Sequence, residues 1–231
     1  MKNITEIVCV LDRSGSMESI VDDAIGGFNT FLKTQKESPG EAVMSVVLFD
    51  DQYELLHSGK PLPAISRLDR QTYVPRGSTA LYDAIGKTID DVGERLARLA
   101  ESERPNKVLF VILTDGHENA SHKYTSQQIH QLITHQRNVY SWEFLFLAAN
   151  QDAFVVSQGL GISGGNSLNF QATSQGTHGM YHKLAKAAIN YRAMDSDNMS
   201  RYNLLADQEE PQQEEPAKPS ETKKKRVRKR I

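Results

Sequence analysis

Oxygen-bearing side chains gather in three short segments of this sequence of 231 residues. Residues 12–16 read DRSGS, residues 77–79 read GST and residues 114–116 read TDG. Alternate residues of a tight loop can point the same way, so the side chains of Asp12, Ser14 and Ser16 can converge on one point. Thr79 and Asp115 would complete a set of two carboxylates and three hydroxyls. Hard oxygen donors of this kind suit Mg²⁺, or alternatively Mn²⁺, and they require no His or Cys ligand.

The number of these donors indicates what else the metal ion would bind. Two carboxylates at most neutralise a divalent ion, and three neutral hydroxyls leave it electrophilic. An octahedral ion would keep one position open, close to the N-terminus of the next helix, where negative charge is favoured. We therefore expect another protein to supply an Asp or Glu carboxylate to this position.

The three segments can meet only if strands of one sheet bring them to the same edge. Apolar runs rich in Val, Ile, Leu and Phe predict the strands, and residues 108–113 and 144–147 show no polar alternation. Strands without alternation are buried on both faces, as in a parallel sheet covered by helices. The predicted strands are Ile4–Leu11, Val43–Asp50, the short edge strand Tyr53–His57, Lys107–Thr114, Ser141–Ala149 and the last strand Ser167–Phe170.

Helical patterns alternate with these strands. They run from Met17 to Leu32, from Leu81 to Leu99 and over about 177–194, and Thr125–Gln128 has capping-box spacing ahead of a further helix. This alternation predicts an α/β fold with a Rossmann-like, doubly wound, mostly parallel sheet, one short antiparallel edge strand and helices on both faces. Ligands of such sheets bind at the carboxyl ends of the strands, where residues 12–16 and 114–116 are expected.

The order of these motifs resembles that of the von Willebrand factor A domain over about residues 1–195. DRSGS after a first strand, GST before a helix and LTDG after a central strand match the metal-ion-dependent adhesion site of that family. The resemblance implies that Ser14, Ser16 and often Thr79 bind the metal directly, and that Asp12 and Asp115 bind it directly or through water. It implies metal-dependent protein binding more than catalysis, often as an adaptor in multi-protein assemblies, including assemblies with AAA+ ATPases.

An enzyme is the alternative at this sheet edge. Asp12 stands where a Mg²⁺-dependent phosphohydrolase or nuclease would have a nucleophilic aspartate. Ser14, however, occupies the position at which an Asp-x-Asp phosphatase has its general acid, and no carboxylate cluster for two metal ions is evident. We therefore expect a cytoplasmic, metal-dependent adaptor without enzymatic activity.

Neighbours of the five candidate ligands would face the partner. We expect Arg13, Ser78, His117 and Glu118 at the rim of the site. Arg13 would either steer a partner carboxylate or be a solvated loop residue. Glu118 would, together with Asn119, influence the choice of partner.

The composition excludes several other classes of protein. Hydrophobic residues make up 39% and charged residues 24%, which is neither a disordered nor a membrane-embedded composition. No apolar run is long enough to span a membrane, and the N-terminus does not read as a signal peptide. The lone Cys9, expected to be a buried small residue, excludes an intramolecular disulfide and a cysteine zinc site. The pair Asp50-Asp51 is interpreted as ordinary turn residues.

The charge pattern divides the chain into one domain, residues 1–200, and a tail, residues 201–231. The tail contains an acidic block, Asp207–Glu215, followed by a basic cluster, and its composition predicts disorder. The basic cluster could bind nucleic acid or an acidic surface, so a nucleic-acid-associated scaffold is a further alternative. Its residues are Lys223, Lys224, Lys225, Arg226, Arg228, Lys229 and Arg230.

Overall fold

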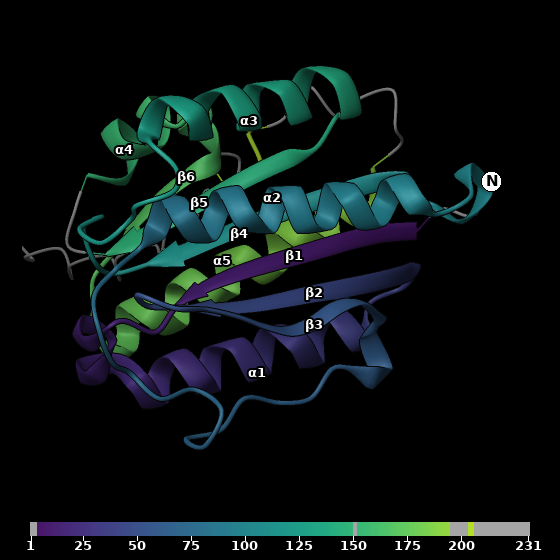
Figure 1. The fold of residues 1–231 in the computed structure, drawn as a ribbon. Coiled ribbons are helices and arrows are strands. Elements are labelled where there is room, and N and C mark those ends of the chain that lie inside the picture. The colour runs from purple at the N-terminus through teal and green to yellow at the C-terminus, as the bar shows by residue number, and fades with distance from the viewer. Residues whose placement is uncertain (1–3, 150–151, 195–202, 206–231) are drawn as a thin grey trace, which may run out of the picture.

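The computed structural model describes residues 4–149, 152–194 and 203–205, which form a sheet between two layers of helices (Figure 1). The sheet has six strands in the order β3-β2-β1-β4-β5-β6, and every neighbouring pair is parallel except β2 and β3. This arrangement confirms the predicted fold class. The strands are β1 (Ile4–Asp12), β2 (Glu41–Phe49), β3 (Tyr53–Pro61), β4 (Lys107–Thr114), β5 (Glu143–Ala149) and β6 (Ser167–Phe170).

Helices cover both faces of the sheet. On one face, α1 (Val21–Glu37) and α5 (Ser174–Ala193) pack against alternate residues of the strands, such as Ile7, Cys9 and Leu11 of β1. On the other face, α2 (Leu81–Arg98), α3 (Ser126–Tyr140) and α4 (Ala153–Gly159) pack against the intervening residues, such as Val8 and Val10. Every residue of β4 is buried, which explains the absence of polar alternation there. Short 3-10 helices are η1 (Gly15–Ile20), η2 (Leu62–Ala64), η3 (Glu101–Glu103) and η4 (Gly164–Asn166).

Local signals in the sequence set several helix boundaries. The capping box at Thr125 is present, since its side chain accepts from the backbone N–H of Gln128 while the Gln128 side chain accepts from the backbone N–H of Thr125. The helix predicted from Met17 begins instead as the 3-10 helix η1 and becomes α-helical only at Val21. The edge strand β3 is longer than predicted and ends at Pro61.

The pairing of β1 with β4 positions the segments that carry the candidate ligands. Leu11 of β1 lies opposite Leu113 of β4 in a parallel register. Asp12 and Thr114 therefore end neighbouring strands at the same edge of the sheet. The loops that follow them, together with the loop before α2, form the end of the domain discussed below.

Two residues beyond the predicted boundary at residue 200 pack against the domain. Leu204 and Leu205, placed in the tail by the sequence analysis, are buried in the same apolar cluster as α1 and α5. The backbone N–H of Leu204 donates to Asn166 Oδ1 over 2.9 Å, and that of Leu205 donates to the Gly165 carbonyl over 3.1 Å. Residues 206–231, including the predicted acidic block and basic cluster, lie outside the described residues.

No helix in the described ranges is both long enough and apolar enough to cross a bilayer.

Candidate metal centre

Three of the candidate ligands form a connected row of oxygen atoms. Ser14 Oγ lies 3.0 Å from Ser16 Oγ, and Ser16 Oγ donates to Asp115 Oδ1 over 2.6 Å. Ser14 stands at the N-cap position of η1, but its hydroxyl forms no capping hydrogen bond. The hydroxyl of Ser14 therefore faces the other candidate ligands and not the start of the helix.

Gly116 shows that the hydroxyls surround one point. A methyl carbon placed on Gly116 in ideal geometry would lie 2.8 Å from Thr79 Oγ1, 3.3 Å from Ser16 Oγ and 3.7 Å from Ser14 Oγ. The hydrogen atom that glycine carries leaves this space open. The predicted hydroxyl donors thus come from two separate loops to a single small cradle beside Asp115.

The two aspartates at this cradle lack cationic partners among the described residues. Asp12 is fully buried; its Oδ1 accepts from the Ser14 backbone N–H over 2.7 Å and its Oδ2 accepts from Thr114 Oγ1 over 2.6 Å. Burial raises the pKa of Asp12 to about 6, and burial also raises the pKa of Asp115. A cation placed between the two carboxylates would offset the cost of burying them.

Tyr73, Thr114 and Asn119, none of which was predicted to support the ligands, hold them in place. The Tyr73 hydroxyl donates to the Asp12 carbonyl, and Thr114 Oγ1 donates to the Asp12 carboxylate. Asn119 Oδ1 accepts from the backbone N–H of Thr79 over 2.9 Å, and the Asn119 N–H donates to the Thr79 carbonyl over 3.1 Å. Thr114 had a sequence signal because it precedes Asp115 at the end of a predicted strand. Asn119 was predicted to influence the choice of partner, and the structure shows it bonded to the backbone of Thr79.

Arg13 is not a rim residue, contrary to both interpretations of it from the sequence. It is 3% exposed, and its Nε donates to Asp50 Oδ2 over 2.9 Å while its Nη1 donates to Glu54 Oε2 over 2.6 Å. The side chain is therefore directed into an ion-pair cluster behind the loop. It cannot steer a partner carboxylate from there.

Glu118 also has a structural role in place of the predicted role at the rim. Its carboxylate accepts hydrogen bonds from the backbone N–H groups of Tyr82, Ala120 and Ser121 and from the Ser121 hydroxyl. It thereby ties the loop after β4 to the first turn of α2. Of the four predicted rim residues, Ser78 and His117 are the exposed ones.

The acidic pair at the end of β2 differs from the predicted turn residues. Asp50 is fully buried and forms ion pairs with Arg13 and Arg76. Asp51, in contrast, is exposed. This difference could not be predicted from the local sequence, because the two arginines lie 37 and 26 positions away from Asp50.

The site contains oxygen donors only. Among the described residues, no group of three or more His, Cys, Asp or Glu side chains is arranged to hold a metal ion. The donor set is instead two carboxylates and three hydroxyls, which favours a hard cation over a soft one.

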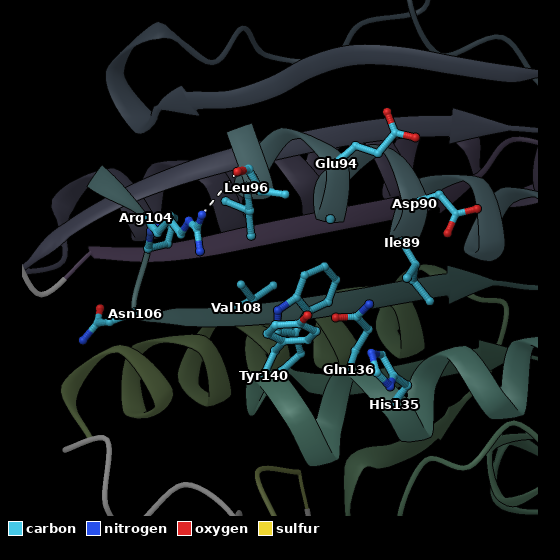
Figure 2. A pocket seen from close by; sticks show the side chains of 14 residues that line it. Ile89, Asp90, Glu94, Leu96, Arg104, Asn106, Val108, His135, Gln136 and Tyr140 are labelled. Atoms are coloured by element: carbon cyan, nitrogen blue, oxygen red, sulfur yellow. Dashed lines mark hydrogen bonds between the residues drawn. The ribbon is translucent and has the colours of Figure 1, made fainter. Parts of the chain in front are cut away.

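Several cavities lie between the elements of the described chain, and one of them reaches Ala80 and Ala120 in the loops before α2 and after β4. Figure 2 shows one of about 420 Å³ between α2 and α3, bordered by Ile89, Gln136 and Tyr140, with Val108 near the opposite end of β4. One of about 520 Å³ lies along α1 and α5, and one of about 250 Å³ lies between α1 and Arg67. One of about 200 Å³ lies between the β2–β3 turn, the start of α2 and the loop after β4. None of these four cavities is lined by a candidate metal ligand. Of the five candidate ligands, Asp12, Ser14, Thr79 and Asp115 are buried and Ser16 is exposed.

No protein-family model matches the chain, and no curated protein matches it in sequence. Solved structures do match. The pilus adhesin SpaC from Lactobacillus rhamnosus GG matches with a TM-score of 0.60 and 15% identity, over 83% of this chain and 31% of that chain. The proximal thread matrix protein 1 from the mussel byssus, in a structure with a zinc-occupied MIDAS motif, matches with a TM-score of 0.57 and 14% identity, over 81% of this chain and 46% of that chain. A von Willebrand factor type A structure from Catenulispora acidiphila matches with a TM-score of 0.53 and 13% identity, over 81% of this chain and 43% of that chain.

These similarities establish the fold. The chain has a von Willebrand factor A fold, and it spans less than half the length of each of these solved chains.

Proposed function

We propose that this chain is a protein-binding module in which a divalent cation accepts an Asp or Glu carboxylate of another protein. The cation would be held by Asp12, Ser14, Ser16, Thr79 and Asp115. The observation that carries the proposal is the cradle at Gly116, where three hydroxyl oxygens from two loops meet beside a buried carboxylate. Such a complete metal-ion-dependent adhesion site (MIDAS) agrees with the fold.

The donor chemistry supports Mg²⁺, with Mn²⁺ as a close substitute. Both ions prefer hard oxygen ligands, whereas zinc sites in proteins are built mainly from His and Cys. The mussel protein holds zinc in its motif, which is consistent with a divalent ion at the equivalent place. Three neutral hydroxyls leave the ion with net attraction for an incoming carboxylate, and the exposed Ser78 and His117 would border that carboxylate.

We propose binding and not catalysis. None of the four cavities reaches the candidate ligands, and Ser14 stands where an Asp-x-Asp phosphatase needs an acid. A Mg²⁺-dependent phosphohydrolase or nuclease is the alternative. The test is a panel of phosphoester substrates with Mg²⁺ or Mn²⁺. If the wild-type chain hydrolyses one of them and Asp12→Asn does not, the enzymatic alternative replaces the binding proposal. We propose that the module acts inside the cell, as an adaptor.

Affinity capture tests the binding proposal. The chain is immobilised with Mg²⁺, with excess EDTA and as Asp12→Ala, and captured proteins are identified by mass spectrometry. We expect partners that are retained only by the wild-type chain with Mg²⁺ and that lose binding when an exposed Asp or Glu is replaced. Capture that survives both EDTA and Asp12→Ala contradicts the proposal.

The basic residues 223–230 suggest an additional contact with nucleic acid or an acidic surface. Binding to a DNA or RNA duplex is measured against salt concentration, with and without residues 222–231. We expect the deletion to lower the affinity and flatten the salt dependence. An unchanged affinity and salt slope would rule this contact out.

A further inference from the structure

A buried ion-pair cluster lies behind the candidate metal centre, at the carboxyl end of β2. Its central group is the Asp50 carboxylate, which is fully buried. Asp50 Oδ2 accepts from Arg13 Nε over 2.9 Å and from Arg76 Nε over 2.8 Å. Asp50 Oδ1 accepts from the backbone N–H of Gln52 over 2.6 Å. Both carboxylate oxygens therefore have defined partners.

The two arginines belong to the two loops that carry the candidate hydroxyl ligands. Arg13 lies between Asp12 and Ser14, and Arg76 lies three residues before Thr79. The Asp50 carboxylate thus bonds to one arginine from each of the two loops. Because neither arginine is itself a candidate ligand, their role is separable from metal coordination.

Backbone hydrogen bonds join the same two loops to each other and to β2. The Arg76 N–H donates to the Arg13 carbonyl over 2.9 Å, and the Gly15 N–H donates to the Gly77 carbonyl over 3.2 Å. The Ala80 N–H donates to the Asp50 carbonyl over 2.9 Å. These backbone hydrogen bonds join residues 12–16, the loop before Thr79 and the end of β2 at the place where the Asp50 ion pairs also lie.

Gly77 shows how closely the parts approach. Its φ is +64°, and a methyl carbon on it would lie 2.3 Å from Asp51 Oδ1. Only glycine adopts this conformation readily and leaves space for the neighbouring carboxylate. The loop before Thr79 therefore lies in close contact with Asp51 in the turn between β2 and β3.

The charge of the cluster also matters for a nearby cation. Arg13 is buried next to Asp12, and its Nη2 has no hydrogen-bond partner among the described residues. Without Asp50, the positive charge of Arg13 would be balanced only by Glu54, whose side chain is 48% exposed. An uncompensated positive charge on the residue between Asp12 and Ser14 would oppose the binding of a divalent cation by these two neighbours.

We propose that Asp50 is a positioning residue for the metal centre: its buried carboxylate joins the loops of Ser14 and Thr79 and balances the charge of Arg13. This inference rests on the proposed function, since it assumes that the cradle binds a cation. It assigns a role to the end of β2, which carries no candidate ligand.

Glu6 provides a matched control on the same strand as Asp12. It is a fully buried carboxylate near the opposite end of β1, where it pairs with Arg95 and accepts from Ser45 Oγ over 2.8 Å. Glu6→Gln and Asp50→Asn each remove one buried charge from an ion pair. They differ in their distance from the cradle.

The first measurement is the Kd for Mn²⁺, by electron paramagnetic resonance or calorimetry, beside the unfolding midpoint of each variant. We expect Asp50→Asn to raise the Kd about tenfold or more and Glu6→Gln to leave it within about twofold. If Asp50→Asn folds poorly, Arg76→Gln is the milder variant, because it removes a half-exposed arginine from the cluster. It is expected to raise the Kd in the same direction by a smaller factor.

The second measurement needs no metal. In EDTA, amide hydrogen exchange at Gly15 and Arg76 reports the two hydrogen bonds that join the loops. We expect Asp50→Asn to speed exchange at both amides and Glu6→Gln to leave them unchanged. Adding Arg13→Met to Asp50→Asn removes the unbalanced charge and should recover part of the lost Mn²⁺ affinity.

The results separate this inference from the proposed function. If the wild-type chain binds no Mn²⁺, the proposed function fails, and exchange in EDTA still decides whether Asp50 joins the loops. If Glu6→Gln weakens Mn²⁺ binding as much as Asp50→Asn, or if Asp50→Asn changes neither the Kd nor the exchange, the positioning role is wrong.

Discussion

Ser16 Oγ donates a hydrogen bond of 2.6 Å to Asp115 Oδ1 across 99 positions of the chain. This contact joins the loop after β1 to the loop after β4, which are neighbours because β1 and β4 pair in parallel. It places the hydroxyl of the first segment, residues 12–16, and the carboxylate of the last, residues 114–116, close enough to bind one ion. The predictions below test what this juxtaposition does.

Asp12→Asn is expected to remove cation binding while preserving the fold. The amide keeps the size of the side chain and can bond the Ser14 N–H and the Thr114 hydroxyl, so the loop is retained. The substitution removes the buried negative charge of Asp12, which has no cationic partner and is costly to bury. The variant should therefore be at least as stable as wild type in EDTA. Thermal unfolding with and without Mg²⁺ checks this. Wild type should gain about 2.7 kcal/mol at a Mg²⁺ concentration of 100 times Kd, and the variant nothing.

Thr79→Val is expected to weaken Mn²⁺ binding, because it removes one cradle hydroxyl without changing the size of a buried side chain. Ser78→Ala removes the neighbouring, exposed hydroxyl and serves as the matched control. Titration with Mn²⁺ should give a raised Kd for Thr79→Val only. Equal effects of the two substitutions would exclude Thr79 as a ligand.

Gly116→Ala is expected to block the cradle without removing any ligand. Its methyl group would lie 2.8 Å from Thr79 Oγ1, in the space assigned to the cation. Mn²⁺ affinity should therefore fall as severely as in Asp12→Asn. Gly93→Ala on α2, where a methyl group meets nothing within 4 Å, is the control and should bind as wild type. Normal Mn²⁺ binding by Gly116→Ala would place the cation elsewhere.

Glu143 predicts a pH dependence that is independent of metal. It is 7% exposed, Asn166 Nδ2 donates to it over 2.9 Å, and burial raises its pKa from 4.5 to about 7. The folded protein keeps the proton at pH values where the unfolded chain has lost it, so this group makes stability fall from about pH 4.5 to about pH 7. Glu143→Gln should be more stable than wild type at pH 8, by up to about 3 kcal/mol, and equally stable at pH 4.

Urea unfolding in EDTA at several pH values tests this, with the exposed Glu101→Gln as the control. Parallel pH curves for Glu143→Gln and wild type would show that Glu143 does not cause the dependence.

Lys107→Met is expected to loosen the end of α5. Lys107 is 2% exposed, and its Nζ donates to the carbonyls of Arg192 and Met194, each over 2.7 Å. Methionine fills a similar space but leaves these buried carbonyls unpaired, which should cost about 2 kcal/mol or more. Urea unfolding measures the loss, and Lys186→Met on the exposed side of α5 is the control. A loss of the same size in both variants would contradict this role.

Much of the fold, and the meeting of the candidate ligands at one edge of the sheet, could be predicted from the sequence, because both depend on local signals. The central residues of β1 and β4 are apolar, and oxygen-bearing residues stand at the end of each strand and directly after it. The side chains that support the site could not be predicted in this way. Asp50 is buried because two arginines reach it from distant loops, and Asn119 fixes Thr79 across 40 positions. The prediction that Arg13 lies at the rim was wrong, because the spacing of residues does not indicate which side of a loop a side chain faces.

Cys9 makes the chain suitable for site-selective labelling. It is the only cysteine, it lies buried in the centre of β1, and burial raises its pKa to about 12. A thiol in this state does not react with maleimide reagents while the protein is folded. His117→Cys would therefore introduce a single reactive thiol at the exposed side of the cradle. A spin label or fluorophore attached there would report the arrival of a partner without any change to the native cysteine.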